Sequence, residues 1–400
     1  FLEENISDSY YISEEPIFVH LEYKNQETPI VTAEAKVVNE QTEVEVDKLM
    51  IASSVEIPNC HLKISDENGN EIVSWITGDK DSIIVNEKLE EMGYFNFEAK
   101  MNENGNIKIN GLLHDKEYVL TETKPADGFV SATDISFMLK LKIEKADYLT
   151  QILIKENEKF VPAISNKLVM YDDTTKIEFS KTEITGEKEI PGCELEVTDK
   201  ETGRIMDKWT SSKDKHIVEG KYVVGKTYMF TEKRPASGFA TAESVEFKIS
   251  DTGNIQQVSM KDDTIKIQFS KIASDTKKLL PGAKYKVLDS KGKKVCEFTT
   301  KKKETALNGI LCAGETYTFV EHQAPKHYKK AKNVKITVKD TGKIQKIKVV
   351  DERIPEVPDT PQTGYNKSIY LYVLALLFGI GMLAKCLNVK NRYRKKQDEE

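Results

Sequence analysis

The chain has 400 residues, with 59 Lys and Arg against 65 Asp and Glu, and its formal net charge of −6 argues against a nucleic-acid-binding protein. The six histidines are scattered, and no Gly-rich phosphate loop or Cys/His metal spacing occurs, so we expect no metal, no cofactor and no enzyme. This length predicts about two to four domains. Because the chain starts at Phe1 without a signal peptide, we expect it to be the C-terminal part of a longer protein.

Three internal repeats organise the chain. Their opening segments are Glu43–Gly69, Lys176–Gly203 and Lys266–Gly292, of which the second and third match closely and the first more weakly. Strand-type alternation dominates each repeat and helical periodicity is absent, which predicts an all-β fold of tandem, antiparallel, Ig-like β-sandwiches. We expect the domains to cover residues 43–173 (with insertions on both sides of its middle strand), 174–263 and 264–352.

Residues 1–42 are predicted to be the end of a truncated domain of the same kind. Asn39 lies nine residues before Lys48, and the same spacing separates Asp172 from Lys181 and Asp262 from Lys271. Asn39 therefore occupies the slot of a closing strand, and its own partner would lie upstream of this chain.

Each predicted domain places three ionisable side chains on core-facing sides of its strands. In each domain, the next inward-facing position after the alternating apolar residues holds a lysine in the first strand, a glutamate in a middle strand and an aspartate in the closing strand. These sets are Lys48, Glu122 and Asp172; Lys181, Glu232 and Asp262; and Lys271, Glu321 and Asp351. An inward charge beside a sandwich core is costly unless it is paired or neutralised.

The glutamate belongs to a box that occurs three times. The box reads YVLTETKPADGF from Tyr118, YMFTEKRPASGF from Tyr228 and YTFVEHQAPKHY from Tyr317. The first two boxes end in turns in which Pro fixes one φ and Gly permits a positive φ.

The five cysteines do not predict a disulfide framework. Cys60 and Cys193 align with Ala283, and a small buried core position explains both. A hairpin disulfide between Cys296 and Cys312 is a less favoured alternative, and Cys386 lies in the hydrophobic tail.

The repeats resemble SpaA-type pilin domains, also called CnaB-type or prealbumin-like domains, of Gram-positive surface proteins. The resemblance covers about residues 40–352 and rests on the first-strand lysine, the glutamate box and the closing Asn or Asp. It departs from the family in using Asp where Asn is commoner, in the KHY that ends the third box, and in the long first domain. It implies an autocatalytic isopeptide bond between the lysine and the aspartate of each set, assisted by the glutamate. Desolvation favours a neutral lysine amine and a protonated glutamate, which suits this reaction, and ordinary buried salt bridges are the alternative.

The C-terminal part resembles a sortase cell-wall sorting signal. After a proline-rich linker at residues 353–363, the signal at 360–400 contains the pentapeptide TPQTG, an apolar run at 369–384 and a basic end. The expected cleavage lies between Thr363 and Gly364, with sortase and peptidoglycan as partners and only transient membrane insertion. The first-position Thr departs from the commoner LPxTG, and a simple membrane anchor with its positive end inside is the alternative.

These features predict a secreted, peptidoglycan-anchored surface protein of a Gram-positive bacterium, a stiffened stalk that presents an upstream adhesive head. One alternative is a sortase-assembled pilus subunit, basal or minor, whose partners would be other pilin subunits. A backbone pilin would carry a linking lysine in a YPK-like motif, and the YKN at Tyr23–Asn25 is too weak a match. Another alternative is an adhesin that binds a host extracellular ligand through residues 43–173.

Overall fold

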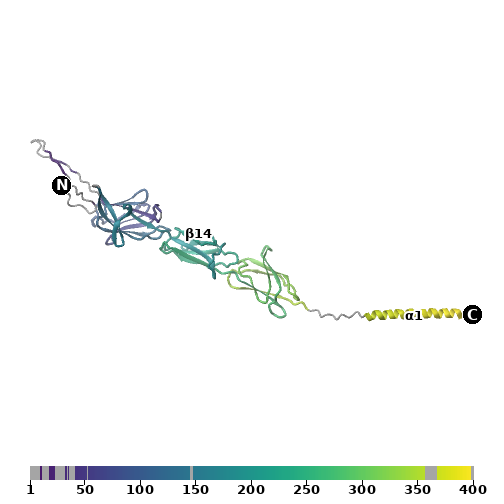
Figure 1. The fold of residues 1–400 in the computed structure, drawn as a ribbon. Helices are drawn as coiled ribbons and strands as arrows, with labels where there is room; N and C mark the ends of the chain where they lie inside the picture. Colours follow the sequence, from purple (N-terminus) through teal and green to yellow (C-terminus); the bar gives the residue numbers. More distant parts are fainter. Residues whose placement is uncertain are drawn as a thin grey trace. The chain divides into compact units, whose positions relative to one another are not determined.

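The computed structural model describes residues 41–51, 53–144, 147–355 and 367–397, together with a few positions before residue 41. Asn39, Thr363 and Gly364 lie outside the described residues. Nearly all secondary-structure elements of the described chain are β-strands, and one long helix follows them in the sequence (Figure 1). It divides into two compact units, Phe1–Lys266 with Asn308–Glu315 and Val338–Ile344, and Ile267–Leu307 with Thr316–Thr337 and Gln345–Glu400.

The first sheet pair comprises residues 43–172. One sheet has the strand order β11–β1–β6–β5, formed by Leu168–Asp172, Glu43–Met50, Ile107–Asn110 and Glu98–Met101. The other has the order β10–β9–β8–β7–β2–β3–β4, formed by Lys159–Pro162, Asp147–Glu156, Ile135–Glu144, Glu117–Lys124, His61–Asp66, Glu71–Ile76 and Asp79–Val85. A short 3-10 turn, Ile164–Asn166, precedes β11. The insertions expected around the middle strand are thus β4 and β5 on one side and β9 and β10 on the other.

The second sheet pair comprises residues 176–262. Its smaller sheet has the order β15–β12–β18, formed by His216–Glu219, Lys176–Glu183 and Ile255–Asp262. Its larger sheet has the order β14–β13–β16–β17, formed by Ile205–Thr210, Glu194–Asp199, Thr227–Arg234 and Val245–Lys248.

The third sheet pair comprises residues 267–351 and repeats this arrangement. Its smaller sheet has the order β22–β19–β25, formed by Thr305–Ala306, Ile267–Ala273 and Gln345–Asp351. Its larger sheet has the order β21–β20–β23–β24, formed by Lys294–Thr299, Lys284–Leu288, Thr316–Gln323 and Val334–Thr337.

An apolar core fills the space between the two sheets of each pair, because alternate residues of every strand face it. In the second pair Phe179 of β12 contacts Phe230 of β16 with ring centroids 5.1 Å apart. In the third pair Phe269 of β19 contacts Tyr285 of β20 at 4.7 Å and stacks on Phe319 of β23 at 5.5 Å. These contacts join opposite sheets, as a sandwich requires.

The first and last strands of each pair are neighbours and run parallel. The paired strands are β1 with β11, β12 with β18, and β19 with β25. The prediction of purely antiparallel sandwiches was therefore wrong at this position. The closing strand crosses back from the other sheet, so its direction is set by that crossing and not by a hairpin. The parallel register brings the end of the closing strand beside the lysine of the first strand.

The C-terminal helix α1 extends over Lys367–Gln397. Within it, Ile369–Arg392 is long and apolar enough to cross a membrane by length and composition, and none of it is buried in the protein. The helix continues beyond the predicted apolar run at 369–384 through Lys385, Lys390 and Arg392, which gives it the length that the run alone lacks.

Candidate functional site: three buried Lys–Glu–Asp triads

Nine ionisable residues converge in three buried triads, one inside each sheet pair. The lysines lie on the first strands β1, β12 and β19, the aspartates end the closing strands β11, β18 and β25, and the glutamates lie on β7, β16 and β23 of the facing sheet. All nine residues are at most 8% exposed. The alternation expected for a half-buried strand, with Tyr228, Phe230 and Glu232 all facing inward, is confirmed.

In the first triad, Lys48 Nζ donates to Asp172 Oδ1 and lies 3.0 Å from Glu122 Oε1. The side chains of all three residues are fully buried. The second triad repeats this geometry, since Lys181 Nζ donates to Asp262 Oδ1 and lies 3.0 Å from Glu232 Oε1.

The third triad contains a fourth polar group. Lys271 Nζ donates to Asp351 Oδ1, to Glu321 Oε2 at 3.0 Å and to the Tyr285 hydroxyl at 2.8 Å. Tyr285 is paired across the strands with Glu321. In the other two pairs the same register position holds Leu62 and Leu195. Burial and the neighbouring carboxylates raise the pKa of Tyr285, so its hydroxyl stays protonated.

A backbone N–H fixes each glutamate. The amides of Ala132, Ala242 and Ala331 donate to Oε2 of Glu122, Glu232 and Glu321, each at 2.7 Å. Each of these alanines lies ten residues after its glutamate, just beyond the turn that ends the box. The box therefore supplies the acid, and its closing turn brings the donor that orients the acid into position.

The remaining carboxylate oxygens show how the acids can share a proton. Glu232 Oε1 and Asp262 Oδ2 are buried without a hydrogen-bond partner, and so are Glu321 Oε1 and Asp351 Oδ2. Glu232 Oε1 does lie 3.0 Å from Lys181 Nζ, but without hydrogen-bond geometry. One proton held between the two acids of a triad would satisfy both orphan oxygens, since a protonated carboxyl becomes a donor.

The aspartates are shifted towards their neutral form. Burial, helped by the nearby glutamate, raises the pKa of Asp172 to about 7 and that of Asp262 to about 6, against the opposing effect of the lysine. The pKa of Asp351 is raised for the same reason. A protonated aspartate beside a lysine amine is the arrangement from which an amide can form with loss of water.

The buried cysteines border two of the triads. Cys60 and Cys193 are both fully buried, as is Ala283 at the same position, which confirms the small core position expected from the sequence. Burial raises the pKa of Cys60 to about 12 and that of Cys193 to about 11, so both remain thiols. Cys296 and Cys312 form no disulfide with each other, so the alternative of a hairpin disulfide was wrong.

Each of these cysteines lies close enough to its two acids to form a three-ligand cluster, with ligand atoms within 4.8 Å of one another. In both clusters the cation that faces the acids is the lysine amine. We therefore assign no metal to them.

The third turn keeps its shape without glycine. Gly128 and Gly238 have φ of +92° and +87°, and His327 at the same position of the third box has φ of +68°. A left-handed conformation costs an L-residue about 1–2 kcal/mol, but the turn still delivers Ala331 to Glu321. The KHY departure therefore does not disturb the third triad.

The sequence reasoning missed the groups that hold the triads in place. Besides the alanine amides and Tyr285, Glu56 Oε2 accepts from the Lys48 amide at 2.9 Å and Glu189 Oε2 accepts from the Lys181 amide at 2.7 Å. Backbone donors leave no signal in a sequence. Tyr285 is detectable in the sequence, because an alignment of the three repeats places a tyrosine where the first and second repeats have leucine.

Comparison with known proteins identifies the domains. Residues 175–264 and 265–353 each match the family described as SpaA, a prealbumin-like fold domain. The chain carries two tandem SpaA domains. They contain the second and third triads, whereas the first triad lies outside the matched residues.

No curated protein matches the chain. Among solved structures, the chain is similar to the Bacillus anthracis TIE protein, with 17% identity and a TM-score of 0.33 over 78% of this chain and 50% of that one. It is also similar to the shaft pilin SpaA from Lactobacillus rhamnosus GG, with 16% identity and a TM-score of 0.26 over 46% of this chain and 99% of that one. A streptococcal ancillary pilin has 14% identity and a TM-score of 0.27 over 78% of this chain and 99% of that one. The chain spans about half of the TIE protein.

Proposed function

We propose that this chain is the wall-proximal stalk of a Gram-positive surface protein, stiffened by one Lys–Asp isopeptide bond in each sheet pair and anchored through a C-terminal sorting signal. The observation that carries the proposal is the threefold recurrence of a buried lysine on the first strand, an aspartate at the end of the last strand and a glutamate on the facing sheet. A single buried salt bridge would be unexceptional. Three sets in which the lysine Nζ donates to the aspartate and lies 3.0 Å from the glutamate favour a common chemistry.

The chemistry is a condensation that occurs once in each domain. In the second pair Glu232 Oε1 takes a proton from the Lys181 ammonium, 3.0 Å away. The neutral amine attacks Cγ of Asp262, whose protonated form is favoured by burial. The new C–N bond forms, and the C–O bond to the aspartate hydroxyl breaks. Glu232 gives its proton to the departing hydroxyl, which leaves as water. Glu232 then receives a proton from the nitrogen. The products are an amide, water and a protonated Glu232, so atoms and protons balance.

The bond removes a costly buried arrangement. Separated charges in an apolar interior carry a desolvation penalty that their attraction does not fully offset. An amide between Lys181 and Asp262 is neutral and joins strands β12 and β18, which are already neighbours in register. Because these are the first and last strands of the pair, a pull on the ends of the domain loads the covalent link before it loads the core.

The same bond stabilises the fold through the unfolded chain. It closes a loop of 81 residues in the second pair, and 124 and 80 residues in the first and third. By analogy with disulfides, closing loops of this length stabilises each domain by about 4.5–5 kcal/mol.

The C-terminal helix supports anchoring. The apolar Ile369–Arg392 segment, with basic side chains at its end, has the length to hold the chain in a membrane while a transpeptidase acts at TPQTG. The alternative is that the chain is a basal or minor pilin, since such a subunit would be anchored in the same way.

Pulling residues 41–355 by their ends in a single-molecule force experiment tests the stalk. An unlocked second pair would release 81 residues, an extension of about 280 Å. We expect no such step in the wild type, and we expect the step in a variant with Asp262→Ala. Full-length unfolding steps in the wild type would show that the domains are not locked.

A second candidate, ligand binding by the first sheet pair, is favoured by one observation. The added strand β9 and the turn that follows β10 line a hollow of about 560 Å³, whose lining includes Ile164, 86% exposed, and Tyr171, 52% exposed. Specific binding of residues 41–173 on a glycan or matrix-protein array would support this function, and the absence of binding would leave the stalk as the better reading.

A further inference from the structure

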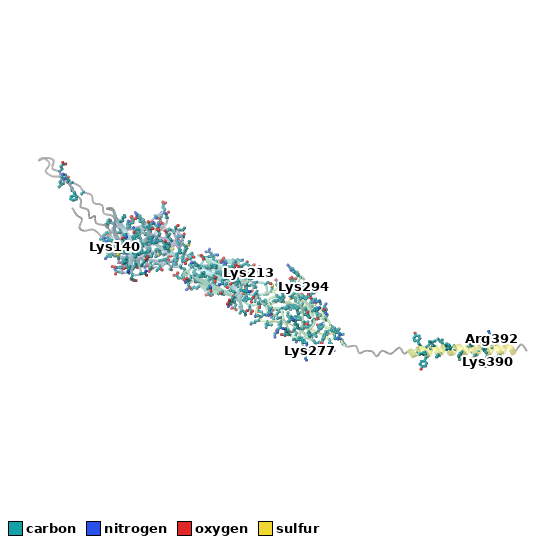
Figure 2. The ribbon with its side chains drawn as sticks, in the orientation of Figure 1. Lys140, Lys213, Lys277, Lys294, Lys390 and Arg392 are labelled. Carbon is teal, nitrogen blue, oxygen red and sulfur yellow. The ribbon has the colours of Figure 1, made fainter. Side chains whose placement is uncertain are left out.

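Charge is strongly segregated along the chain. Residues 43–173 contain 14 basic and 25 acidic residues, and residues 174–263 contain 14 basic and 17 acidic residues. Residues 264–352 contain 21 lysines, no arginine and nine acidic residues. The net charges are thus −11, −3 and +12 for the three sheet pairs. Lys277 and Lys294 are two of the lysines that project from the third pair (Figure 2). A net charge of +12 on one small domain favours an anionic partner.

Four of these lysines line one groove. A hollow of about 430 Å³ lies between residues 329–334 and the end of β25, and its basic lining residues are Lys329, Lys330, Lys332 and Lys348. All four are exposed. The acids in the lining are Asp351, which is buried and paired with Lys271, and Glu352, which lies 3.3 Å from Lys329. The groove therefore keeps a clear excess of positive charge.

The third triad holds both walls of this groove. The Ala331 amide donates to Glu321 Oε2, which fixes the segment that carries Lys330 and Lys332. Lys271 holds Asp351 at the end of β25, the strand that carries Lys348. The lysines thus project from a backbone that is fixed on both sides, which lowers the ordering cost of binding.

The groove lysines are particular to the third pair. Aligned on the triad glutamate and aspartate, the positions of Lys329, Lys330, Lys332 and Lys348 hold Ala240, Thr241, Glu243 and Ser259 in the second pair, and Val130, Ser131, Thr133 and Val169 in the first. The fold does not require lysine there, because two copies of the same site have none.

The lining also indicates which anion fits. Lysine ammonium groups are point charges on flexible stems and suit phosphate, whereas bidentate carboxylate recognition favours arginine, which this domain lacks. The groove lining contains no aromatic side chain, so it offers no platform for stacking nucleic-acid bases. It is concave, whereas a bilayer presents a flat surface.

We propose that this groove binds a linear polyol-phosphate polymer, so that the third sheet pair makes a non-covalent attachment in addition to the covalent anchor. Successive phosphates of such a polymer would contact Lys330, Lys332 and Lys348 along the groove. The attachment is electrostatic, so added salt weakens it. It does not depend on whether the isopeptide bonds form.

The test measures binding of the full chain, in a non-ionic detergent, to an immobilised glycerol-phosphate polymer. The groove variant carries the second-pair residues or their neutral equivalent: Lys329→Ala, Lys330→Thr, Lys332→Ser and Lys348→Ser. The control variant makes the same change of charge outside the groove: Lys291→Ser, Lys301→Ser, Lys302→Ser and Lys303→Ser. We expect the groove variant to lose about thirtyfold in affinity and the control to lose about threefold or less. Thermal unfolding of both variants checks that the fold is kept.

Two results would overturn the proposal. Equal losses in the two variants would mean a diffuse charge effect and no groove site. Equal or tighter binding to a single-stranded oligonucleotide or to glycerophosphoserine, the soluble headgroup of an anionic phospholipid, would assign the surface to a different partner. Loss of binding in the groove variant with all isopeptide bonds intact would support the groove as the binding site. This result would not bear on the stalk proposal.

Discussion

Replacing Glu232 by glutamine should prevent the second isopeptide bond while changing the core little. The two side chains have nearly the same volume, but glutamine cannot take the proton that Lys181 must lose. Glu232 Oε1 is the carboxylate oxygen 3.0 Å from that amine and is fully buried, so water cannot replace it as a base. The expected product is a folded domain with an unlinked Lys181 and Asp262.

The size of the effect follows from the loop that the bond closes. Lys181 and Asp262 are 81 residues apart, and releasing a loop of this length returns about 4.5 kcal/mol of conformational entropy to the unfolded chain. The variant also keeps a buried Lys–Asp pair in place of a neutral amide, which adds to the cost. We expect the free energy of unfolding of the second pair to fall by about 4.5 kcal/mol or more.

The assay combines intact mass with urea unfolding followed by the fluorescence of Trp209. The protein has two tryptophans, and Trp209 lies in the second pair, with its ring 5.6 Å from that of Phe230. Trp75→Phe in both proteins makes Trp209 the single reporter. Glu196→Gln is the matched control, because Glu196 is buried on β13 and paired with Lys233 but lies outside the triad.

We expect the Glu196→Gln control to keep all bonds and to change stability by about 1 kcal/mol or less. If Glu232→Gln showed the same mass deficit as the wild type, the glutamate would have no part in the chemistry. A loss of stability without any change in the number of bonds would reduce the triad to an ordinary ion pair.

Three further predictions address the acceptor, the pH dependence and the anchor. Asp262→Asn should still form the second bond but release ammonia in place of water. High-resolution mass spectrometry distinguishes the mass lost as ammonia from the mass lost as water. An Asp262→Asn protein without that bond would contradict the mechanism. In Glu232→Gln, burial still raises the pKa of the unlinked Asp262 above its unfolded value of 3.8, although the contribution of the Glu232 charge is gone. The stability that this carboxyl contributes is therefore fully present below pH 3.8 and is lost as the pH rises through its folded-state pKa. The wild type, whose carboxyl has been consumed, should lack this dependence in urea titrations at pH 4 and 7. Thr363→Ala should leave the protein in the membrane fraction of Gram-positive cells, and covalent recovery with peptidoglycan would refute the sorting signal.

Much of the site could be predicted because strands have a period of two. Once Tyr228 and Phe230 are taken as core residues, Glu232 must face the same way, and the same argument places the lysines and aspartates. The repeat then strengthened the argument, since three sets kept the same order of strand and charge. The small core position of Cys60 and Cys193 followed from alignment with Ala283.

The rest depended on contacts between distant strands. The parallel pairing of β12 with β18 is set by how the chain crosses between sheets, which the local pattern of neither strand encodes. The Ala242 amide is a backbone group and has no residue preference that would reveal its role. The groove depends on where residues 329–334 lie beside β25, although the lysines themselves stand out against Thr241 and Ser259 in the aligned repeat.

The intact mass of residues 41–355, produced without any other enzyme, tests the central claim most directly. Three aspartate acceptors predict a mass lower than that of the sequence by three waters, and peptide mapping should find Lys48 joined to Asp172, Lys181 to Asp262 and Lys271 to Asp351. A folded protein whose mass equals that of its sequence would contradict the account, and the three triads would then be buried salt bridges.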